Sequence, residues 1–184
     1  MILTHSISQT LGKDKCLALP MFHSLTGCDT VSAFFGHGKQ SAWDALQTLP
    51  NSVTALKSLT VDPPGEPNIP SSMTKTLSRL VIKMYNLSGD DIDAARLGGL
   101  YFQGRQFGNL PPSSDAFNRH LLRAVYQGGH IWGQCLIRNP KLPDATAWGW
   151  CKELHSWMPV WITTPIISDK LPQLALCKCK KDCR

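Results

Sequence analysis

The sequence predicts a mainly α-helical protein. Apolar residues recur at helical spacing in three stretches, glycine and proline divide the chain at short intervals, and little in the pattern suggests a large sheet. The chain has 184 residues, of which 42% are hydrophobic and 17% charged, and this balance excludes bulk disorder, coiled coil and collagen-like repeats. A folded chain of this length buries about 70% of its unfolded surface, so a core of its own is possible.

A helix-turn-helix unit is predicted at about residues 15–50. Four apolar residues recur at helical spacing in its first helix: Leu17, Met21, Phe22 and Leu25. Residues 16–25 should therefore form a buried helix that Gly27 ends. A glycine-bracketed turn leads to a second helix over residues 39–49, which Pro50 closes, and residues 51–60 can add another.

The stretch DPPGEPNIP holds four prolines in nine residues, and we interpret residues 61–70 as a linker. Beyond it, Ser71 or Ser72 can cap a further helix. The apolar residues of that helix keep a helical rhythm: Met73, Leu77, Leu80, Val81 and Met84. Asp90, Asp91 and Asp93 precede another helical stretch, where acidic residues are stabilised by the helix macrodipole, so we interpret them as helix-terminal residues rather than metal ligands.

A third regular helix follows Pro111-Pro112. Its pattern separates an apolar face, Phe117, Leu121, Ala124 and Val125, from a polar set that should point away, Arg119, Arg123 and Gln127. His23 and His120 fall on helices beside apolar residues, and we interpret both as structural. The chain then becomes irregular and tryptophan-rich, with room for one short strand in residues 157–164. Five of the six tryptophans lie there: Trp132, Trp148, Trp150, Trp157 and Trp161.

These tryptophans favour a role as aromatic anchors beneath long loops. Stacking on single-stranded bases is the alternative, although the segment has few lysines or arginines.

The stretch LTGCDTVSAFFGHGKQSAWDAL, residues 25–46, is the most informative for function. Amides of a glycine turn and the positive N-terminus of the next helix can hold a phosphate, and Lys39 adds charge at the same point. Asp29 stands where a carboxylate could bind a hard divalent cation. A plain helix-turn-helix with a capping aspartate is the alternative.

The net charge of +6 is placed unevenly. Residues 170–184 hold five of the cations against one acidic residue, which suits either a solubilising tail or a nucleic-acid contact. No apolar run reaches the roughly 18 residues of a membrane span, and no secretory signal is present, so we expect an intracellular protein without a membrane partner, with the nucleus as a candidate compartment.

The turn resembles a segment of flap-endonuclease and PIN-like nucleases. Gly27, Cys28 and Asp29 match its Gly-[Ser/Cys]-Asp part, and Gly36, Gly38 and Lys39 match its Gly-x-Gly-x-Lys part, although the proline common before that lysine is absent. The resemblance implies that Asp29 belongs to a Mg²⁺ or Mn²⁺ site. It also implies that Gly36, Gly38 and Lys39 contact the backbone of a nucleic-acid duplex.

Over residues 8–184 the chain is similar to the C-terminal half of an uncharacterised, transposon-associated group of animal proteins. Those proteins carry a PIN-like nuclease domain, a Trp-rich region and a tesmin-type CXC cysteine-rich end. The sequence segments that carry the similarity are LPMFHSLTGCDTVSAFFGHGK, LPPSSDAFNRHLLRAVYQ, AWGW and CKCKKDC. The similarity divides the chain into a remnant of the α/β nuclease domain with its helix-turn-helix (1–60), the linker (61–70), a helical region (71–127), an irregular Trp-rich region (128–169) and a basic Cys-rich tail (170–184).

The upstream acidic motifs of that family have no counterpart here. Metal-dependent phosphodiester cleavage commonly uses two cations about 4 Å apart, held by several carboxylates, whereas this chain offers only Asp29 in the right context. No Ser-His-Asp grouping, P-loop or dinucleotide fingerprint supports another enzyme class. We therefore expect a fragment of a nuclease, without catalytic residues of its own, that retains nucleic-acid binding. A non-catalytic module that binds a protein or chromatin partner is the alternative.

The tail holds Cys177, Cys179 and Cys183 among lysines. Thiolates at this spacing can share a Zn²⁺, but tetrahedral zinc needs four ligands and only three thiols are present. The tail resembles the opening of a CXC module, so we expect an incomplete zinc site whose further cysteines would follow residue 184.

Overall fold

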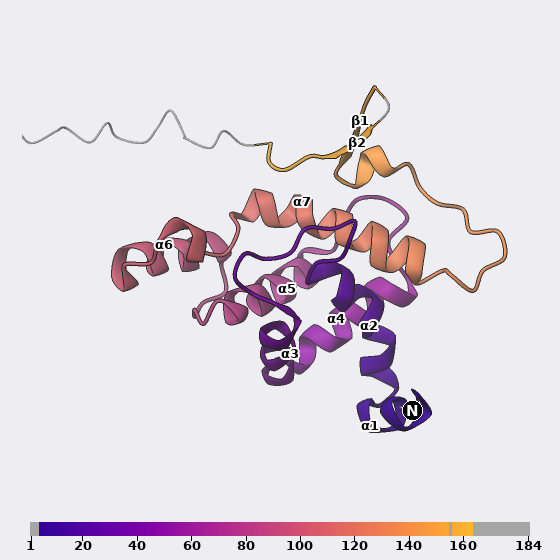
Figure 1. Ribbon diagram of the computed structural model, residues 1–184, viewed down its shortest axis with the longest axis horizontal. Helices are drawn as coiled ribbons and strands as arrows, with labels where there is room; N and C mark the ends of the chain where they lie inside the picture. The colour runs from indigo at the N-terminus through magenta and orange to yellow at the C-terminus, as the bar shows by residue number, and fades with distance from the viewer. Residues whose placement is uncertain (1–3, 155, 164–184) are drawn as a thin grey trace, which may run out of the picture.

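The computed structural model describes residues 4–154 and 156–163 (Figure 1). Helices dominate this part of the chain, and the prediction of a mainly α fold is confirmed. The α-helices are α1 (Thr4–Leu11), α2 (Lys13–Leu25), α3 (Lys39–Thr48), α4 (Pro50–Val61), α5 (Ser71–Met84), α6 (Ile92–Gln103) and α7 (Ser114–Val125). The shorter elements are the 3₁₀ turns η1 (Phe107–Asn109) and η3 (Ala145–Trp148), the π-helical segment η2 (Tyr126–Trp132) and the strands β1 (Trp150–Glu153) and β2 (Ser156–Pro159).

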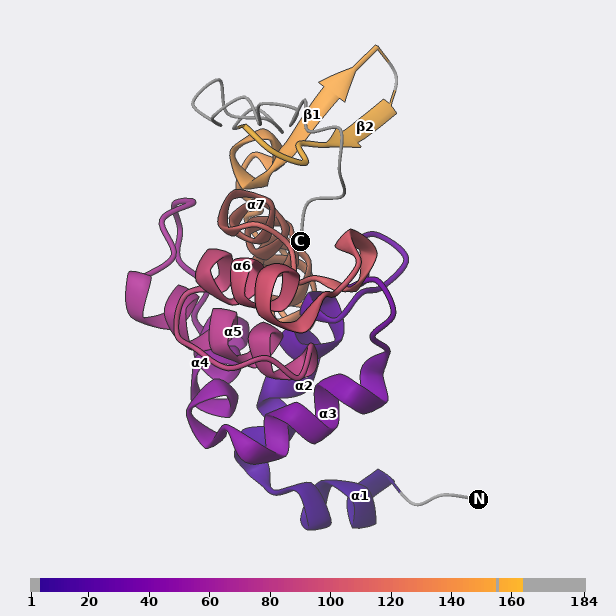
Figure 2. The same cartoon turned by 90° about the vertical axis from the view of Figure 1, so that its left-hand side faces the viewer.

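The helices are arranged in layers. From one end of the molecule to the other, the order is the β1–β2 hairpin, α7, α6 and α5, then α3, with α1 at the far end (Figure 2). Helix α2 packs against α4, α7 and η2, and α3 packs against α5. Pro50 closes α3, as predicted, and also begins α4, because the first position of a helix needs no amide hydrogen.

One connected core joins the helices on both sides of residues 61–70. The buried residues before this segment include Met21, Phe22, Leu25, Leu46, Leu56 and Leu59, and those after it include Leu77, Leu80, Val81, Phe117, Leu121 and Val125. The segment contacts the body as well, since His130 Nε2 lies 3.1 Å from the carbonyl oxygen of Pro64 and Ile69 packs against the core. Helices from both halves of the sequence therefore bury their apolar faces against one another.

Glycines allow η2 to lie directly on the backbones of two other helices. A Cβ atom added to Gly128 would lie 2.9 Å from Met21 Cα in α2. A Cβ atom added to Gly129 would overlap the carbonyl oxygen of Leu59 in α4. A Cβ atom added to Gly133, the residue after η2, would overlap the carbonyl oxygen of Thr60 in α4. No side chain fits in these three contacts, so the close packing of η2 on α2 and α4 depends on glycine.

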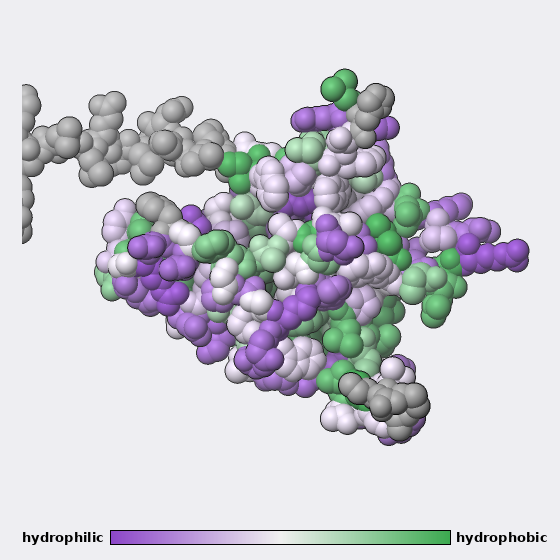
Figure 3. Space-filling model, viewed as in Figure 1, coloured by the Kyte–Doolittle hydropathy of each residue, from purple (hydrophilic) through white to green (hydrophobic). Residues whose placement is uncertain are grey.

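The Trp-rich end forms a short antiparallel hairpin, with Trp150 opposite Pro159 and Glu153 opposite Ser156. The sequence suggested one short strand here, and β2 overlaps it, whereas β1 was not anticipated. Trp148 is fully buried against His130 and fits the predicted role of an anchor, but Trp157 and Trp161 are 49% and 58% exposed. Between η2 and η3, the loop of residues 133–144 projects from the body, and its tip is hydrophilic (Figure 3).

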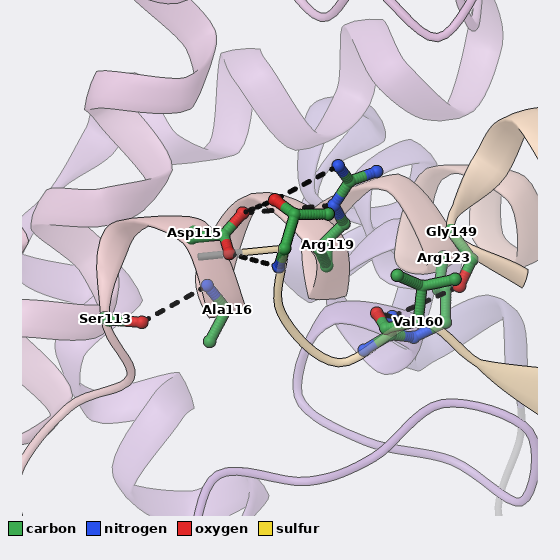
Figure 4. A network of polar contacts seen from close by, with 8 residues as sticks. Ser113, Asp115, Ala116, Arg119, Arg123, Gly149 and Val160 are labelled. Carbon is green, nitrogen blue, oxygen red and sulfur yellow. Dashed lines mark hydrogen bonds and ion pairs between the residues drawn. The ribbon is translucent and has the colours of Figure 1, made fainter. Parts of the chain in front are cut away.

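The side chain of Arg123 is buried, contrary to the prediction from the sequence. The pattern predicted that this residue points away from the apolar face of its helix, and that prediction is wrong, since Arg123 is only 2% exposed. The hairpin folds over it, and its guanidinium donates to the carbonyl oxygens of Val160 (2.6 Å) and Gly149 (3.3 Å) (Figure 4). The rings of Trp150 and Trp161 lie 6.0 and 5.4 Å from the same group, within the range of cation–π attraction.

Hydrogen bonds also hold Thr163 at the beginning of α7. The amide and hydroxyl of Thr163 donate to Asp115 at 2.5 and 2.9 Å, and Arg119 donates to the Thr163 hydroxyl.

No helix in the described part of the chain is long and apolar enough to span a bilayer.

Candidate nucleic-acid interface

The predicted turn lies between α2 and α3, and Gly27 begins it. Gly27 has φ +102°, a conformation that other residues rarely adopt. A Cβ atom there would also lie 2.6 Å from the Cβ of Ala33, so the loop returns across the position that a side chain would need. Thr26 completes the end of α2, because its hydroxyl donates to the Phe22 carbonyl oxygen at 2.7 Å. Glycine is therefore required at residue 27 on both conformational and steric grounds.

His120 of α7 fastens the turn to the body of the protein. Its Nε2 lies 2.8 Å from the carbonyl oxygen of Leu25, and its Nδ1 lies 3.3 Å from the hydroxyl of Ser32. Burial lowers the pKa of His120 to about 4, although the Leu25 carbonyl opposes the shift, so the ring is neutral at pH 7. In that state Nε2–H donates to Leu25, and Nδ1 accepts from Ser32. The structural role predicted for this histidine agrees with its position.

Two buried side chains hold the middle of the loop. Val31 is 1% exposed and Phe34 is 6% exposed, and the Phe34 ring lies 4.8 Å from that of His120. On the far side of the loop, Tyr85 donates from its hydroxyl to the carbonyl oxygen of Phe35. The backbone of the glycine turn is thus supported from α5 and α7.

Lys39 is at the predicted place, but its ammonium faces the end of α2. Its three hydrogen-bond acceptors are the Gly27 carbonyl oxygen at 2.7 Å, the Thr26 hydroxyl at 3.0 Å and the His23 carbonyl oxygen at 3.1 Å. An ammonium has three N–H donors, so these contacts use all of them. Burial lowers the pKa of Lys39, and the nearby Cys28 opposes that shift. Lys39 therefore binds one carbonyl of the last turn of α2 and the two residues that follow it, and places a positive charge at the start of α3.

Gly36 and Gly38 leave the backbone of the turn open. A Cβ atom at either position would meet no atom within 4 Å, and Gly36 has φ +74°. Gly38 is the N-cap of α3 without a side-chain cap, and the first turn of α3 contains no acidic residue. Within residues 4–154 and 156–163, no acceptor forms a hydrogen bond with the amides of residues 38–41. Unpaired amides at a helix N-terminus are suited to an anion such as a phosphate group.

Asp29 lies in the same loop and is exposed. It is close enough to His23 to raise the pKa of that ring, although burial and Lys39 lower it overall. His23 itself stacks on Trp132 with ring centroids 5.3 Å apart. Among the described residues, no group of three or more histidines, cysteines or acidic residues could hold a metal ion. Asp29 is thus one accessible carboxylate, which by itself does not make the carboxylate set of a two-metal site.

The acidic residues at the beginning of α6 have structural partners. Asp91 is the N-cap of α6 and accepts from the amide of Ala94 at 2.7 Å, and Asp93 accepts from the amide of Ser114 at 3.0 Å. Asp90 pairs with Arg79 at 2.6 Å. The contact of Asp91 agrees with its interpretation as a helix-terminal residue of α6, whereas Asp90 and Asp93 are held by partners in α5 and α7. The three cysteines of the tail, Cys177, Cys179 and Cys183, lie outside the described residues, so the zinc site stays a prediction.

Sequence reasoning missed the two side chains that position the turn, namely Ser32 and His120. His120 was interpreted as structural, but its local sequence does not predict its partners, which lie 88 and 95 residues earlier in the chain.

Comparison with models of protein families, with curated proteins and with solved structures finds no match to this chain.

Proposed function

We propose that this chain is a fragment of a PIN-like, metal-dependent nuclease that is not catalytic alone and contacts a nucleic-acid backbone. The contact is made by the turn of Gly36 and Gly38 and by the first turn of α3. The observation that carries the proposal is the set of open amides at the start of α3, which has neither a side-chain cap nor an acidic residue in its first turn. A duplex phosphate can approach these amides closely because both glycines leave the space above the backbone empty.

Lys39 supports the same contact in an indirect way. Its ammonium holds the end of α2 and thereby fixes the turn, and its charge adds to the positive potential at the start of α3. In the complete nuclease, Asp29 would be one of several carboxylates around Mg²⁺ or Mn²⁺. In this chain alone, we expect no cleavage of duplex DNA with either ion. Cleavage that disappears in Asp29→Ala would contradict this part of the proposal.

Substitution at Gly38 tests the binding site without disturbing the fold. Its φ of −91° suits any residue, and both aspartate and asparagine are good N-caps, so neither variant should lose stability. Gly38→Asp puts a carboxylate where the phosphate should lie and should weaken duplex binding at least tenfold. Gly38→Asn also places an oxygen on these amides but carries no charge, so it should weaken duplex binding less than Gly38→Asp does. Fluorescence anisotropy with a labelled DNA duplex at 50 and 200 mM salt measures both.

The salt series gives a second test. Phosphate contacts release counterions, so the affinity of the parent chain should fall steeply between the two salt concentrations. No duplex binding at 50 mM salt, or equal loss in the two Gly38 variants, would sink the proposal.

A second candidate function is a non-catalytic protein- or chromatin-binding module. The observation that favours it is the exposure of Trp157 and Trp161 on the hairpin, since large exposed aromatic rings are typical of protein interaction sites. Binding that depends on these two rings but changes little with salt would support this candidate over the first.

A further inference from the structure

Helix α6 carries apolar residues on both of its faces. Its inner face, with Ile92, Ala95 and Gly99, is buried, and a Cβ atom added to Gly99 would lie 3.0 Å from the side chain of Leu110. A helix that is apolar all round is normally buried on all sides. The outer face of α6 has its residues at the spacing i, i+3, i+4 and i+7, and it consists of Ala94, Leu97, Gly98 and Tyr101, with Phe102 at its edge.

This outer face is nevertheless open to solvent. The exposed fractions of Leu97, Tyr101 and Phe102 are 55%, 74% and 91%, and Ala94 is exposed as well. A Cβ atom added to Gly98 would meet no atom within 4 Å. Helix α6 lies at one end of the molecule, and the view from that end has it in front (Figure 2). Neighbouring exposed apolar side chains of this kind mark an interaction surface.

The charges beside this face lie at its two ends. Asp91 and Asp93 are at the start of α6, and Arg105 follows its end. Their hydrogen-bond partners in the described part of the chain are uncharged. The two carboxylates accept from backbone amides, and Arg105 donates to the carbonyl oxygen of Tyr85 at 2.6 Å. These contacts fix the groups without neutralising them, so the surface is acidic at one end, apolar in the middle and basic at the other.

Antiparallel pairing with a second copy of the chain matches each part of this surface. With the two-fold axis at Gly98, Phe102 of one copy faces Ala94 of the other, so a large side chain meets a small one. The helix backbones can approach closely because glycine lies at the crossing point. Asp91 of each copy is then at the end of the helix pair where Arg105 of the second copy lies, and opposite charges attract.

We propose that α6 forms the interface of a symmetric homodimer, in which the outer faces of two copies pack against each other in antiparallel orientation. The second copy is the favoured occupant because both its charges and its large and small residues complement those of the first. A single pair of helices is smaller than a standard protein–protein interface, so the dimer should be weak, with a dissociation constant in the micromolar range. Nothing in this proposal depends on nucleic-acid binding.

Sedimentation equilibrium of the full chain tests the dimer, in reducing buffer because the chain has seven cysteines. We expect a monomer–dimer equilibrium between about 5 and about 500 µM. Tyr101→Glu puts a carboxylate near the axis in both copies and should weaken association about tenfold or more. Leu136→Glu is the matched control, since Leu136 is 96% exposed and lies outside α6, and it should change nothing. Circular dichroism reports whether both variants are folded, as expected for largely exposed positions.

Isotope-filtered NMR of a mixture of labelled and unlabelled chains locates the interface. We expect contacts between the Phe102 ring of one copy and the Ala94 methyl group of the other. A chain that stays monomeric at all concentrations would overturn the proposal and leave this surface to a different protein. Contacts of Leu97 or Tyr101 with residues 164–184 of the same chain would also overturn it, as would a dimer that a folded Tyr101→Glu does not weaken.

Discussion

The ammonium of Lys39 lies 2.7 Å from the carbonyl oxygen of Gly27, so the first residue of α3 is bound to the residue that begins the turn after α2. This contact joins the two helices that flank the candidate site and sets the geometry of the turn between them. Lys39 thus contributes to the stability of the turn as well as to its positive charge.

Lys39→Met should therefore lower the free energy of unfolding by about 1 kcal/mol, because it removes the donors to three acceptors at a partly exposed site. Lys39→Arg keeps the charge and several donors and should lose less. Urea denaturation measures both, with Lys13→Met as an exposed control that should leave the midpoint unchanged. A Lys39→Met protein as stable as the parent would show that these hydrogen bonds contribute nothing.

Gly27→Ala should be among the most damaging single changes in the turn. The added Cβ meets Ala33 at 2.6 Å in a backbone conformation that alanine avoids, and we expect a loss of about 3 kcal/mol. Gly36→Ala is the matched control, since it has a similar φ but open space, and it should cost about 1 kcal/mol. Thermal and urea denaturation of the two proteins compares them. Equal losses would mean that the contact with Ala33 is unimportant.

His120 should make the stability depend on pH. Its pKa is about 4 in the folded protein against 6.5 in the unfolded chain, so the unfolded chain binds the proton first as the pH falls. The stability linked to this group is complete above pH 6.5 and is lost between pH 6.5 and pH 4, a change of about 3 kcal/mol. Below pH 4 both states are protonated and no further loss follows.

His120→Gln keeps a donor near the Leu25 carbonyl but cannot titrate. The difference in unfolding free energy between this variant and the parent should therefore vary with pH over the same window. Urea denaturation at several values from pH 7.5 to pH 4 measures that difference, and subtraction removes the contribution of the other histidines. A difference that stays constant over this range would contradict the assignment.

Arg123→Met should loosen the hairpin. It removes the donor to the carbonyl oxygens of Gly149 and Val160 and the cation beside Trp150 and Trp161, at a cost of about 2 kcal/mol. Hydrogen exchange of β1 and β2 should speed up more than that of α2. Arg119→Met, which removes a more exposed contact to Thr163, should have a smaller effect, and the reverse order would argue against Arg123 as the anchor.

Much of the helical architecture could be predicted from the sequence, because it depends on local pattern. The apolar rhythm of Leu77, Leu80 and Val81 marks a face that the core does bury, and Pro50 divides α3 from α4 as expected. The beginning of α2 was less exact, at Lys13 rather than near residue 16, since no apolar residue marks its first turn.

The rest depends on contacts between distant parts of the chain. Arg123 follows the polar rhythm of its own helix, and only the hairpin formed by residues 149–160 makes it a buried residue. The same holds for the candidate site, where Gly36, Gly38 and Lys39 could be picked out from their local order. The direction of the Lys39 ammonium could not, because it depends on which carbonyls the preceding helix leaves open.

The contact of η2 with α2 and α4 has a consequence for tracing the ancestry of this chain. Loop residues and surface charges can change freely between relatives. Gly128, Gly129 and Gly133, in contrast, contact the backbone of another helix directly, so a side chain at any of them would require a helix to move. A sequence with two adjacent glycines and a third four residues later, at the end of an amphipathic helix, would be expected in every homologue that keeps this packing. Such a spacing can identify descendants whose overall similarity has faded.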